Sequence, residues 1–257
     1  MSVHYEVAER VARITLDRPE RLNAVDAATE AELERIWTDL EARRDVSCAV
    51  LTGAGEKAFC VGADMKEAGT SGLDYWAAPR PNGFGGIAFR RSLDVPLIAR
   101  VNGFAMGGGF EMVLGADIVV AADTARFALP EARVGRMPLD GGMVLLQRKI
   151  PHNLAMAVML TGRRWTAEEM ARFGIVNEVA PAGGLDAAVA AWVEDIVACA
   201  PLSLRAIKQT VNRTANLTPS EAQALKLPAV VEALLSADGE EGVRAFNEKR
   251  APVWQGR

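Results

Sequence analysis

The segment Val101–Asp117 combines three consecutive glycines with a carboxylate and is the richest part of the chain in groups that could do chemistry. An apolar run precedes Gly107–Gly109, and a helical pattern begins near Phe110. Glycine has no Cβ, so the backbone can bend tightly here and approach a ligand. Unpaired N–H groups at the start of a helix suit an oxygen that becomes negative during a reaction. Glu111 could reach the same pocket, but the segment alone is explained more simply by a tight turn with a surface glutamate.

Another glycine, Gly62, lies in the segment Ala58–Glu67. It permits a turn that aims the N–H of Ala63 into a cleft, and Lys66 is available to meet an anionic group such as a phosphate. Without further context, a plain loop that enters a helix is the simpler interpretation of this segment.

The third segment, Arg126–Gly142, places a carboxylate among apolar side chains. Pro130 fixes the chain just before Glu131, which is the only carboxylate between Phe127 and Arg136. Apolar walls raise the pKa of a carboxyl group, which suits it to exchange protons near neutral pH. The alternative interpretation is a solvated glutamate that caps a turn.

Motifs for other chemistries are absent or poorly placed. Gly53–Ala58 and Gly83–Ala88 match GxGxxA, but the first does not open a helix and no strand precedes the second. The chain has no GxxxxGKS or GxxxxGKT loop and no GxSxG elbow, and its only histidines are His4 and His152. These facts disfavour a dinucleotide-dependent dehydrogenase, a P-loop nucleotide hydrolase, a Ser-His-Asp hydrolase and a histidine-rich metal site.

The composition is that of a globular protein with one large domain, or one domain with an appendage. Of the 257 residues, 50% are hydrophobic and 24% are charged, and the formal net charge is -4. The basic residues form no dense run, so we expect no nucleic-acid binding. Three widely separated cysteines argue against a disulfide framework or a zinc site. We find no signal-peptide pattern and no apolar run that could span a membrane, so we expect a cytoplasmic protein.

Hydrophobic patterning predicts an α/β core over residues 1–200 and a helical region over residues 201–257. Runs rich in β-branched residues alternate with a helical pattern, which indicates a parallel sheet. The predicted strands are Val11–Leu16, Cys48–Thr52, Leu97–Val101 and Ile118–Ala122. The predicted helices are about Asp26–Arg43, a helix capped by Asp186, and about Ser203–Arg213, Ser220–Leu235 and Glu240–Lys249. Thr70–Gly86 is typical of a long surface loop, and such loops are often lids.

Taken together, these segments resemble the enoyl-CoA hydratase/isomerase (crotonase) family. The similarity lies in ITLDRPERLNAV, LTGAGEKAFCVGADMKE, VNGFAMGGGFEMVLGADIVVAAD, FALPEARVG, TGRRWTAEEMARFGIVNEV and FNEKRAPVWQGR. Their joint order and spacing are specific, and they span nearly the whole chain. The resemblance implies a ClpP/crotonase-like spiral of ββα units. It also implies C-terminal helices that mediate trimerisation, hence a homotrimer or a dimer of trimers.

For the site, the resemblance implies an acyl-CoA thioester substrate and two glutamates that hold one water between them. Glu131 matches the main acid/base, and Glu111 matches the group that orients the water. The N–H groups of Ala63 and Gly108 match the oxyanion hole for the thioester oxygen. No metal or redox cofactor is implied, because coenzyme A belongs to the substrate. Matches to coenzyme A contacts are Arg21, Leu22, Ala24, Ala63, Asp64, Met65, Lys66 and Gly108 and, towards a neighbouring subunit, Phe246 and Lys249.

The presence of both glutamates favours reversible hydration of a 2-enoyl-CoA. A carboxylate pair can also shuttle protons in an isomerase, so that activity stays open. Relatives that bind RNA or act as scaffolds would more often lack the glutamates or carry a basic helix, and neither feature occurs here.

Within the family, the chain is also similar to the carnitinyl-CoA dehydratase branch, in GFGG, GGGFE, FALPEA, TGRR and KRAPVWQGR. It differs in Ala63, where that branch tends to carry Trp, and in Asp140, which directly precedes the glycines instead of following the proline. A trimethylammonium substrate would favour an aromatic or acidic cage. Candidates for a cage, or simply for packing of the loop, are Asp74, Tyr75, Trp76 and Phe84.

Overall fold

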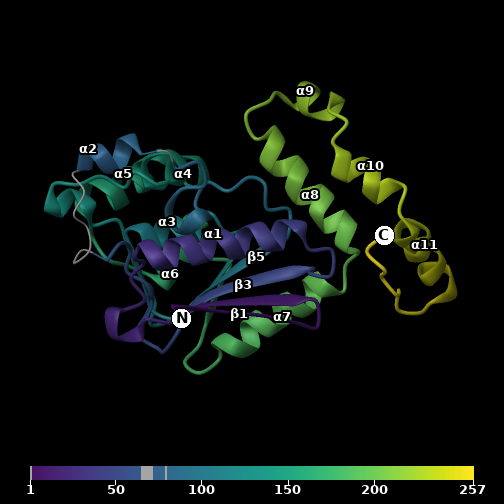
Figure 1. Ribbon diagram of the computed structural model, residues 1–257, viewed down its shortest axis with the longest axis horizontal. Coiled ribbons are helices and arrows are strands. Elements are labelled where there is room, and N and C mark those ends of the chain that lie inside the picture. Colours follow the sequence, from purple (N-terminus) through teal and green to yellow (C-terminus); the bar gives the residue numbers. More distant parts are fainter. Residues whose placement is uncertain (1, 65–71, 79) are drawn as a thin grey trace.

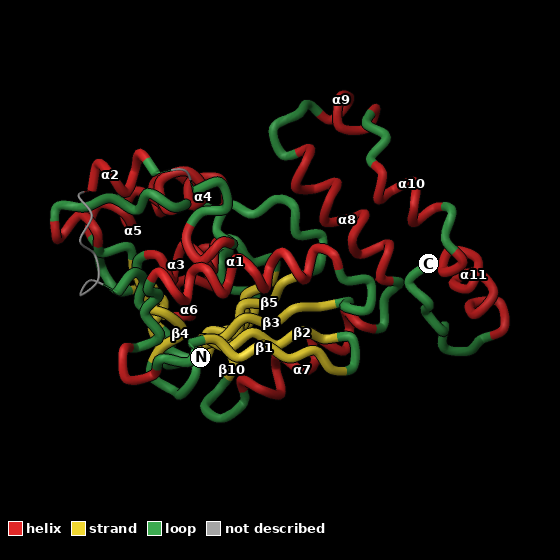
Figure 2. The backbone as a smooth tube through the Cα atoms, in the orientation of Figure 1, coloured by secondary structure: helices red, strands yellow, loops and turns green. Residues whose placement is uncertain are grey.

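The computed structural model describes residues 2–64, 72–78 and 80–257, and its centre is a six-stranded sheet (Figures 1 and 2). The strands lie in the order β1, β2, β3, β5, β7, β10, with β1 antiparallel to β2 and the other pairs parallel. Four predicted strands are confirmed as β2, β3, β5 and β7, and β1 and β10 extend the sheet at its edges. The bounds are Val3–Ala8 (β1), Val11–Leu16 (β2), Cys48–Gly53 (β3), Leu97–Val101 (β5), Ile118–Ala122 (β7) and Glu178–Ala180 (β10).

A second sheet of four short strands, which the hydrophobic pattern does not predict, supports the three segments with possible chemistry. Its order is β4, β6, β8, β9. β4, β6 and β8 are parallel, so their carboxyl ends meet at one edge. Gly62, Gly107 and Glu131 follow these three ends closely, so the sheet gathers them. The bounds are Ala58–Cys60 (β4), Phe104–Met106 (β6), Arg126–Ala128 (β8) and Trp165–Thr166 (β9).

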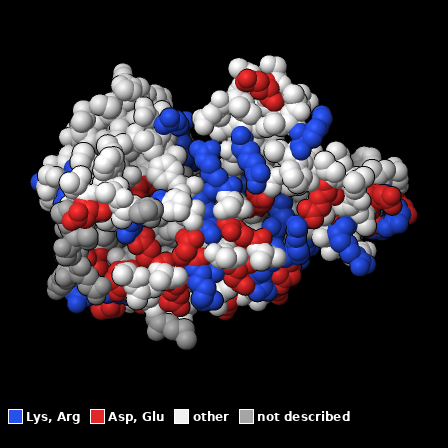
Figure 3. Space-filling view, turned by 45° about the horizontal axis from the view of Figure 1, so that its top comes forward, with Lys and Arg blue, Asp and Glu red and all other residues white. Residues whose placement is uncertain are grey.

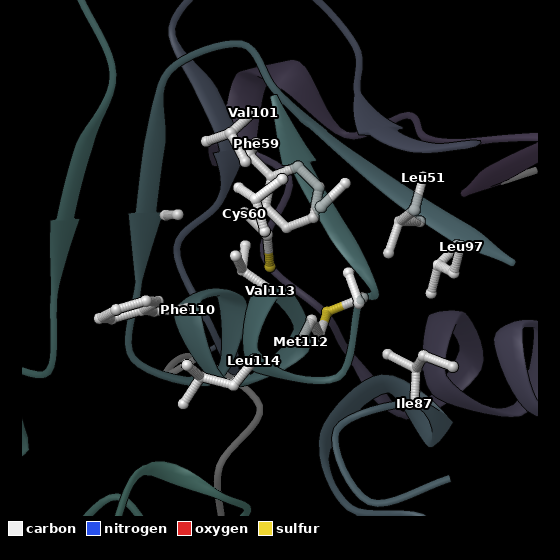
Figure 4. Close-up of a cluster of buried hydrophobic side chains, with 14 of the residues drawn as sticks. Leu51, Phe59, Cys60, Ile87, Leu97, Val101, Phe110, Met112, Val113 and Leu114 are labelled. Atoms are coloured by element: carbon white, nitrogen blue, oxygen red, sulfur yellow. The ribbon is translucent and has the colours of Figure 1, made fainter. Parts of the chain in front are cut away.

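Helices cover the sheets and bury their apolar faces. The predicted first helix is confirmed as α1 (Ala27–Ala42), and the Asp26 side chain caps it by accepting from the N–H of Thr29. α3 (Gly108–Leu114) is buried along its whole length. Figure 4 shows Val113 of α3 beneath Phe59 and Cys60, within the main apolar cluster. This packing holds α3 against β4. The other helices of the body are α4 (Gly142–Lys149), α5 (His152–Thr161), α6 (Ala167–Phe173) and α7 (Leu185–Val197).

The C-terminal helices form an arm that extends from the body (Figure 1). α8 joins the arm to the body, because Arg205 donates to the carbonyl oxygen of Arg43 at 2.5 Å and Lys208 pairs with Asp117 at 2.6 Å. The predicted boundary at residue 200 lies between α7 and α8. The bounds are Pro201–Thr214 (α8), Pro219–Ala224 (α9), Pro228–Leu234 (α10) and Ala237–Glu248 (α11).

The single helix predicted over Ser220–Leu235 is wrong, because the structure has two helices there, α9 and α10. Leu227, which precedes Pro228, is extended with φ −73° and ψ 138°. The proline ring disfavours the helical conformation for the residue before it, so the chain breaks at this point and restarts with Pro228 as the first helical residue.

The predicted cap of α7 is also wrong. α7 begins at Leu185 after Gly184, and the side chain of Asp186 pairs instead with Arg100 at 2.7 Å. The stretch Thr70–Gly86, expected to be a loop, holds the short helix α2 (Gly72–Ala77) and the 3-10 turn η2 (Phe84–Gly86) in its described part.

Within the described residues, no single helix is long and apolar enough to cross a membrane. α7 and α8 pass that test only as a pair, and they meet at a bend of 100°. On the face in Figure 3, acidic and basic side chains are interspersed, with many basic ones between the body and the arm.

Candidate active site

Two glycine turns bring the ends of β4 and β6 into contact. Gly62 has φ +93°, a conformation that favours glycine, and a methyl group added there would lie 3.1 Å from the backbone nitrogen of Gly108. A methyl group on Gly108 would lie 2.7 Å from the ring of Phe84. One on Gly109 would lie only 2.1 Å from the carbonyl oxygen of Cys60. The close approach of the two turns therefore requires these glycines.

Two backbone donors are available where the turns meet. Ala63 forms an isolated parallel bridge with Val25, whose N–H donates to the carbonyl oxygen of Gly62 and whose carbonyl oxygen accepts from the N–H of Asp64, both at 2.9 Å. The N–H of Ala63 itself points away from Val25. Gly108 is the first residue of α3, so its N–H has no partner in the helix. Across the described part of the chain, neither of these two N–H groups has an acceptor.

Glu111 projects from α3 and is only 3% exposed. Its Oε1 accepts hydrogen bonds from the backbone N–H groups of Asp140 and Gly142, both at 2.9 Å. Burial raises the pKa of Glu111 to about 8; the charges of Asp140 and Glu131 act in the same direction, and the two N–H donors oppose it. The carboxyl group is thus held in a fixed position with a proton affinity suited to neutral pH.

Glu131 is half-buried at the start of the 3-10 turn η3 (Glu131–Val134). Its Oε2 is buried and has no hydrogen-bond partner among the residues that the structure describes. Its Oε1 faces Gly107, where an added methyl group would lie 2.9 Å from it. Burial raises the pKa of Glu131 above its usual range. Because Glu111 and Glu131 repel each other when both are ionised, the pair favours a state that holds one proton.

The arrangement offers two kinds of group at one place. Two backbone donors can stabilise an oxygen that becomes negative, and two carboxyl groups can move protons beside it. Among the described residues, no group of three or more His, Cys, Asp or Glu side chains is arranged to hold a metal ion.

We expect a pH-dependent gain in stability when Glu111 is replaced by Gln. The pKa of Glu111 is raised from 4.5 to about 8 on folding, so its contribution to stability is complete below about pH 4.5 and is lost as the pH rises through 8. The neutral amide avoids this loss. The stability of the variant relative to the wild type, measured as the difference in free energy of unfolding, should therefore be greater at about pH 9 than at about pH 5 by on the order of 3–5 kcal/mol.

Urea unfolding of both proteins at the two pH values measures this difference. Glu6→Gln, which changes an exposed carboxylate on β1, is the matched control. An equal stability difference at both pH values would show that the proton affinity of Glu111 does not change on folding.

The loop that precedes α1 is held by Arg18 and Asn23. The guanidinium of Arg18 donates to the carbonyl oxygen of Ala24 at 2.7 Å and pairs with Asp64 at 3.0 Å. The buried amide of Asn23 donates to the carbonyl oxygen of Ala58 at 2.8 Å. These contacts tie the loop to β4 and to the Gly62 turn, so the loop lies beside the N–H groups of Ala63 and Gly108.

The residues predicted to contact coenzyme A fall into three groups. Those on the Arg18 loop and the glycine turns are the exposed Arg21, Leu22, the buried Ala24, Ala63, Asp64 and Gly108. Met65 and Lys66 lie outside the described residues. Phe246 and Lys249 lie on and directly after α11, at the opposite end of the molecule from α3 (Figure 1). The structure of one chain therefore does not bring these last two residues to the glutamates.

The described aromatic side chains of the 70–86 stretch do not form a common cage. The guanidinium of Arg80 lies 4.2 Å from the centre of the Tyr75 ring and covers one of its faces. Phe84 is buried against Gly108, whereas Trp76 is 67% exposed. Packing, rather than a cationic substrate, accounts for Phe84.

Sequence reasoning did not identify Asn23 or Asp140 as residues that shape the site. Asn23 stands inside the matched motif ITLDRPERLNAV, and Asp140 stands directly before two glycines. These two positions in the sequence are the only indications of a role for Asn23 and Asp140, and neither position indicates which residue is the hydrogen-bond partner. The partners, Ala58 for Asn23 and Glu111 for Asp140, are distant in sequence.

The chain matches the family model described as Enoyl-CoA hydratase/isomerase over residues 6–257. It is 40% identical over 263 residues to a protein from Citrobacter koseri named carnitinyl-CoA dehydratase, with 100% of this chain and 99% of the relative covered. The protein of the same name from Escherichia coli K12 is 40% identical over 260 residues, with the same coverage.

Solved structures of similar proteins agree. The enoyl-CoA hydratase from Bacillus anthracis superposes with a TM-score of 0.93 at 31% identity, covering 100% of both chains. The enoyl-CoA hydratase from Mycobacterium tuberculosis H37Rv gives a TM-score of 0.89 at 34% identity, covering 100% of this chain and 99% of the other.

Proposed function

Because the chain belongs to the enoyl-CoA hydratase/isomerase family and has the crotonase fold, we propose that it adds water reversibly to the double bond of a 2-enoyl-CoA thioester. One observation carries this proposal. The buried Glu111 and the half-buried Glu131, both with raised pKa, lie beside the N–H groups of Ala63 and Gly108, which have no acceptor among the described residues.

In this proposal, the N–H groups of Ala63 and Gly108 bind the thioester carbonyl oxygen. That oxygen becomes negative when water attacks the β-carbon and an enolate forms. Donors held in place before the reaction stabilise this charge without reorganisation, and one such donor contributes about 2.7–4 kcal/mol in well-studied oxyanion holes. The glycine turns support this role because they fix both donors in a rigid backbone.

The two glutamates handle the water. Glu111, fixed by two N–H donors, orients the water, and Glu131 takes a proton from it as the oxygen attacks the β-carbon. Glu131 then returns a proton to the α-carbon, which collapses the enolate and restores the carboxylate. The unpartnered Oε2 of Glu131 supports this role, because a proton-transfer group must be free to meet the substrate.

The next point is which acyl group of the thioester the protein prefers. The names of the 40% identical relatives favour crotonobetainyl-CoA, the dehydration product of carnitinyl-CoA, as the alternative substrate. Two features favour an unsubstituted short-chain enoyl-CoA. Position 63 is Ala, where the carnitinyl-CoA dehydratase branch tends to carry Trp. In addition, the guanidinium of Arg80 covers one face of the Tyr75 ring, and this positive charge would repel a trimethylammonium group. Isomerisation of a 3-enoyl-CoA by the same carboxylate pair is the remaining alternative.

Loss of the absorbance of the conjugated thioester tests the proposal, with crotonyl-CoA and crotonobetainyl-CoA measured side by side. Turnover of crotonyl-CoA alone would make the protein a general hydratase, and preference for the betaine would make it a carnitinyl-CoA dehydratase. Formation of the conjugated absorbance from 3-hexenoyl-CoA, without hydration, would instead indicate an isomerase. No change with any of the three would overturn the proposed function.

We propose that the chain forms a homotrimer or a dimer of trimers. The C-terminal helices support this, because they expose large apolar side chains that a monomer would leave in water. These are Ile207, Val211, Val231, Leu234, Leu235, Val243 and Phe246. Light scattering should give a native mass three or six times that of one chain, and Leu235→Asp should lower it. A monomer at micromolar concentration would contradict the prediction.

We also propose that no metal or redox cofactor takes part, since the thioester and the protein groups named above supply all proton transfers. Full activity after dialysis against EDTA is the expected result.

A cytoplasmic location is proposed as well, because acyl-CoA thioesters occur there and Cys48, Cys60 and Cys199 are free thiols. Cell fractionation tests the location.

A further inference from the structure

A third carboxylate, Asp140, lies next to the glutamate pair. It precedes α4, is only 7% exposed and contacts the site in two ways. Its backbone N–H donates to Oε1 of Glu111 at 2.9 Å. Its carboxylate accepts a hydrogen bond from the hydroxyl of Tyr75 on α2. Asp140 therefore connects Glu111 to the Tyr75 hydroxyl on α2.

The contacts continue from Tyr75 to α1. The guanidinium of Arg80 donates to the hydroxyl oxygen of Tyr75 at 3.0 Å, lies over its ring, and pairs with Glu30 at 2.8 Å. This network fixes the Asp140 carboxylate from the side away from Glu111. Burial raises the pKa of Asp140 above its usual range, and the Tyr75 hydrogen bond and the charge of Arg80 only partly oppose this effect.

Within the part of the chain that the structure describes, Asp140 and Glu131 are the charged side chains that act on Glu111. The described elements packed against α3 include β4, β6, η2 and α4. β8 also contacts α3, because the rings of Phe110 and Phe127 lie 5.4 Å apart. The guanidinium of Arg126 on β8 donates to the carbonyl oxygens of Thr124 and Ala125. β4 presents the thiol of Cys60, whose pKa is raised by burial, while β6 and η2 carry no titratable side chain. The charged residues of α4, Arg148 and Lys149, stand at its far end. Among the described residues, Asp140 and Glu131 are the charges that raise the pKa of Glu111 in addition to its burial.

We propose that Asp140, held by Tyr75 and Arg80, is a positioning residue that orients Glu111 and favours its protonated form during the reaction. This inference rests on the proposed function. The backbone N–H of Asp140 sets the position of the Glu111 carboxyl group, and its side-chain charge disfavours ionisation of that group. With Glu111 protonated, Glu131 is the carboxylate of the pair that is free to accept the proton of the attacking water.

The variant Asp140→Asn distinguishes the effect of the negative charge of Asp140 from the effect of its size and hydrogen bonds. Asparagine keeps the backbone N–H and an amide oxygen for the Tyr75 hydroxyl but removes the negative charge. We expect the limb of the pH profile of kcat/KM that belongs to the glutamate pair to move to lower pH by roughly one unit. Asp195→Asn, which changes an exposed aspartate on α7, is the matched control and should leave the profile unchanged. An unshifted profile in Asp140→Asn would overturn the inference.

A second measurement needs no turnover. Infrared absorption of protonated carboxyl groups, titrated against pH and assigned with Glu111→Gln, reports the protonation of Glu111 directly. Asp140→Asn should move that titration to lower pH by the same amount. If the wild type hydrates no substrate but the titration moves, the proposed function fails while the effect of Asp140 on Glu111 stands. If the wild type is active and the titration does not move, the inference alone fails.

The role of Tyr75 is tested by a double-mutant cycle. Tyr75→Phe removes only the hydroxyl and should lower kcat several-fold, with little change in KM, because the carboxylate of Asp140 loses its fixed position. In the Asp140→Asn background the same change should have a clearly smaller effect. Equal effects in both backgrounds would show that Tyr75 does not act through Asp140.

Discussion

Replacement of Glu131 by Gln is expected to lower kcat for the hydration of crotonyl-CoA by about 10²–10⁴-fold, the usual contribution of a general acid/base. Gln has nearly the same shape as Glu but neither accepts nor returns the proton of the water. The Oε2 atom of Glu131 has no hydrogen-bond partner among the described residues, so an amide group at that position breaks no hydrogen bond of this atom. KM should change little, because the carbonyl oxygen of the substrate is held by other groups.

The same thioester absorbance assay measures kcat, and circular dichroism with thermal unfolding checks the fold. Glu168→Gln is the matched control, since Glu168 is an exposed glutamate on α6. We expect the midpoint of unfolding of Glu131→Gln to be unchanged or higher, because a buried carboxyl group with a raised pKa is replaced by a neutral amide. A kcat within threefold of the wild type would remove Glu131 from the proposed mechanism.

The second large effect is expected at Gly62. In Gly62→Ala the new methyl group would lie 3.1 Å from the nitrogen of Gly108 and 3.2 Å from the carbonyl oxygen of Met106. The two turns must then separate by a few tenths of an ångström, which moves the N–H groups of Ala63 and Gly108 apart. Loss of one oxyanion donor costs about 10²–10³ in kcat, and we expect a decrease of that order.

A residue with φ +93° also strains the backbone when it carries a side chain, so the effect of strain must be separated from the effect on the donors. Gly174 provides the control, because it has φ +90° at the end of α6 and an alanine methyl group there would have no atom within 4 Å. Both variants should lose about 1–2 kcal/mol in free energy of unfolding. Only Gly62→Ala should lose activity, and an equal loss in Gly174→Ala would attribute the effect to strain.

The elements that the sequence predicts well are those with a long and regular pattern. β2, β3, β5 and β7 are mainly apolar runs that contain β-branched residues and lie in a buried sheet, and α1 buries its apolar residues at helical spacing. α8 and α11 follow their predicted ranges to within about three residues. The helix over Ser220–Leu235 was divided by one residue, Pro228, whose effect on Leu227 outweighs the helical pattern around it.

The short strands β4, β6 and β8 have no pattern to detect, because three residues cannot show an alternation. They form only because each pairs with a neighbour that is distant in the chain. Yet these strands position the site, since their carboxyl ends bring Gly62, Gly107 and Glu131 to one edge. Local sequence therefore identified the chemically useful segments, but the pairing that unites them is tertiary.

The sequence by itself determined the residue types of the site. The glycines were identifiable because tight turns need residues without a Cβ, and the two glutamates were identifiable from the order and spacing of the motifs around them. Only the tertiary structure decided their environment. It assigned two N–H donors to Oε1 of Glu111, left Oε2 of Glu131 without a partner among the described residues, and placed Asp140 between Glu111 and Tyr75. The physical reason is that burial and neighbouring charge set a carboxyl group's proton affinity, and both arise from residues far apart in the chain.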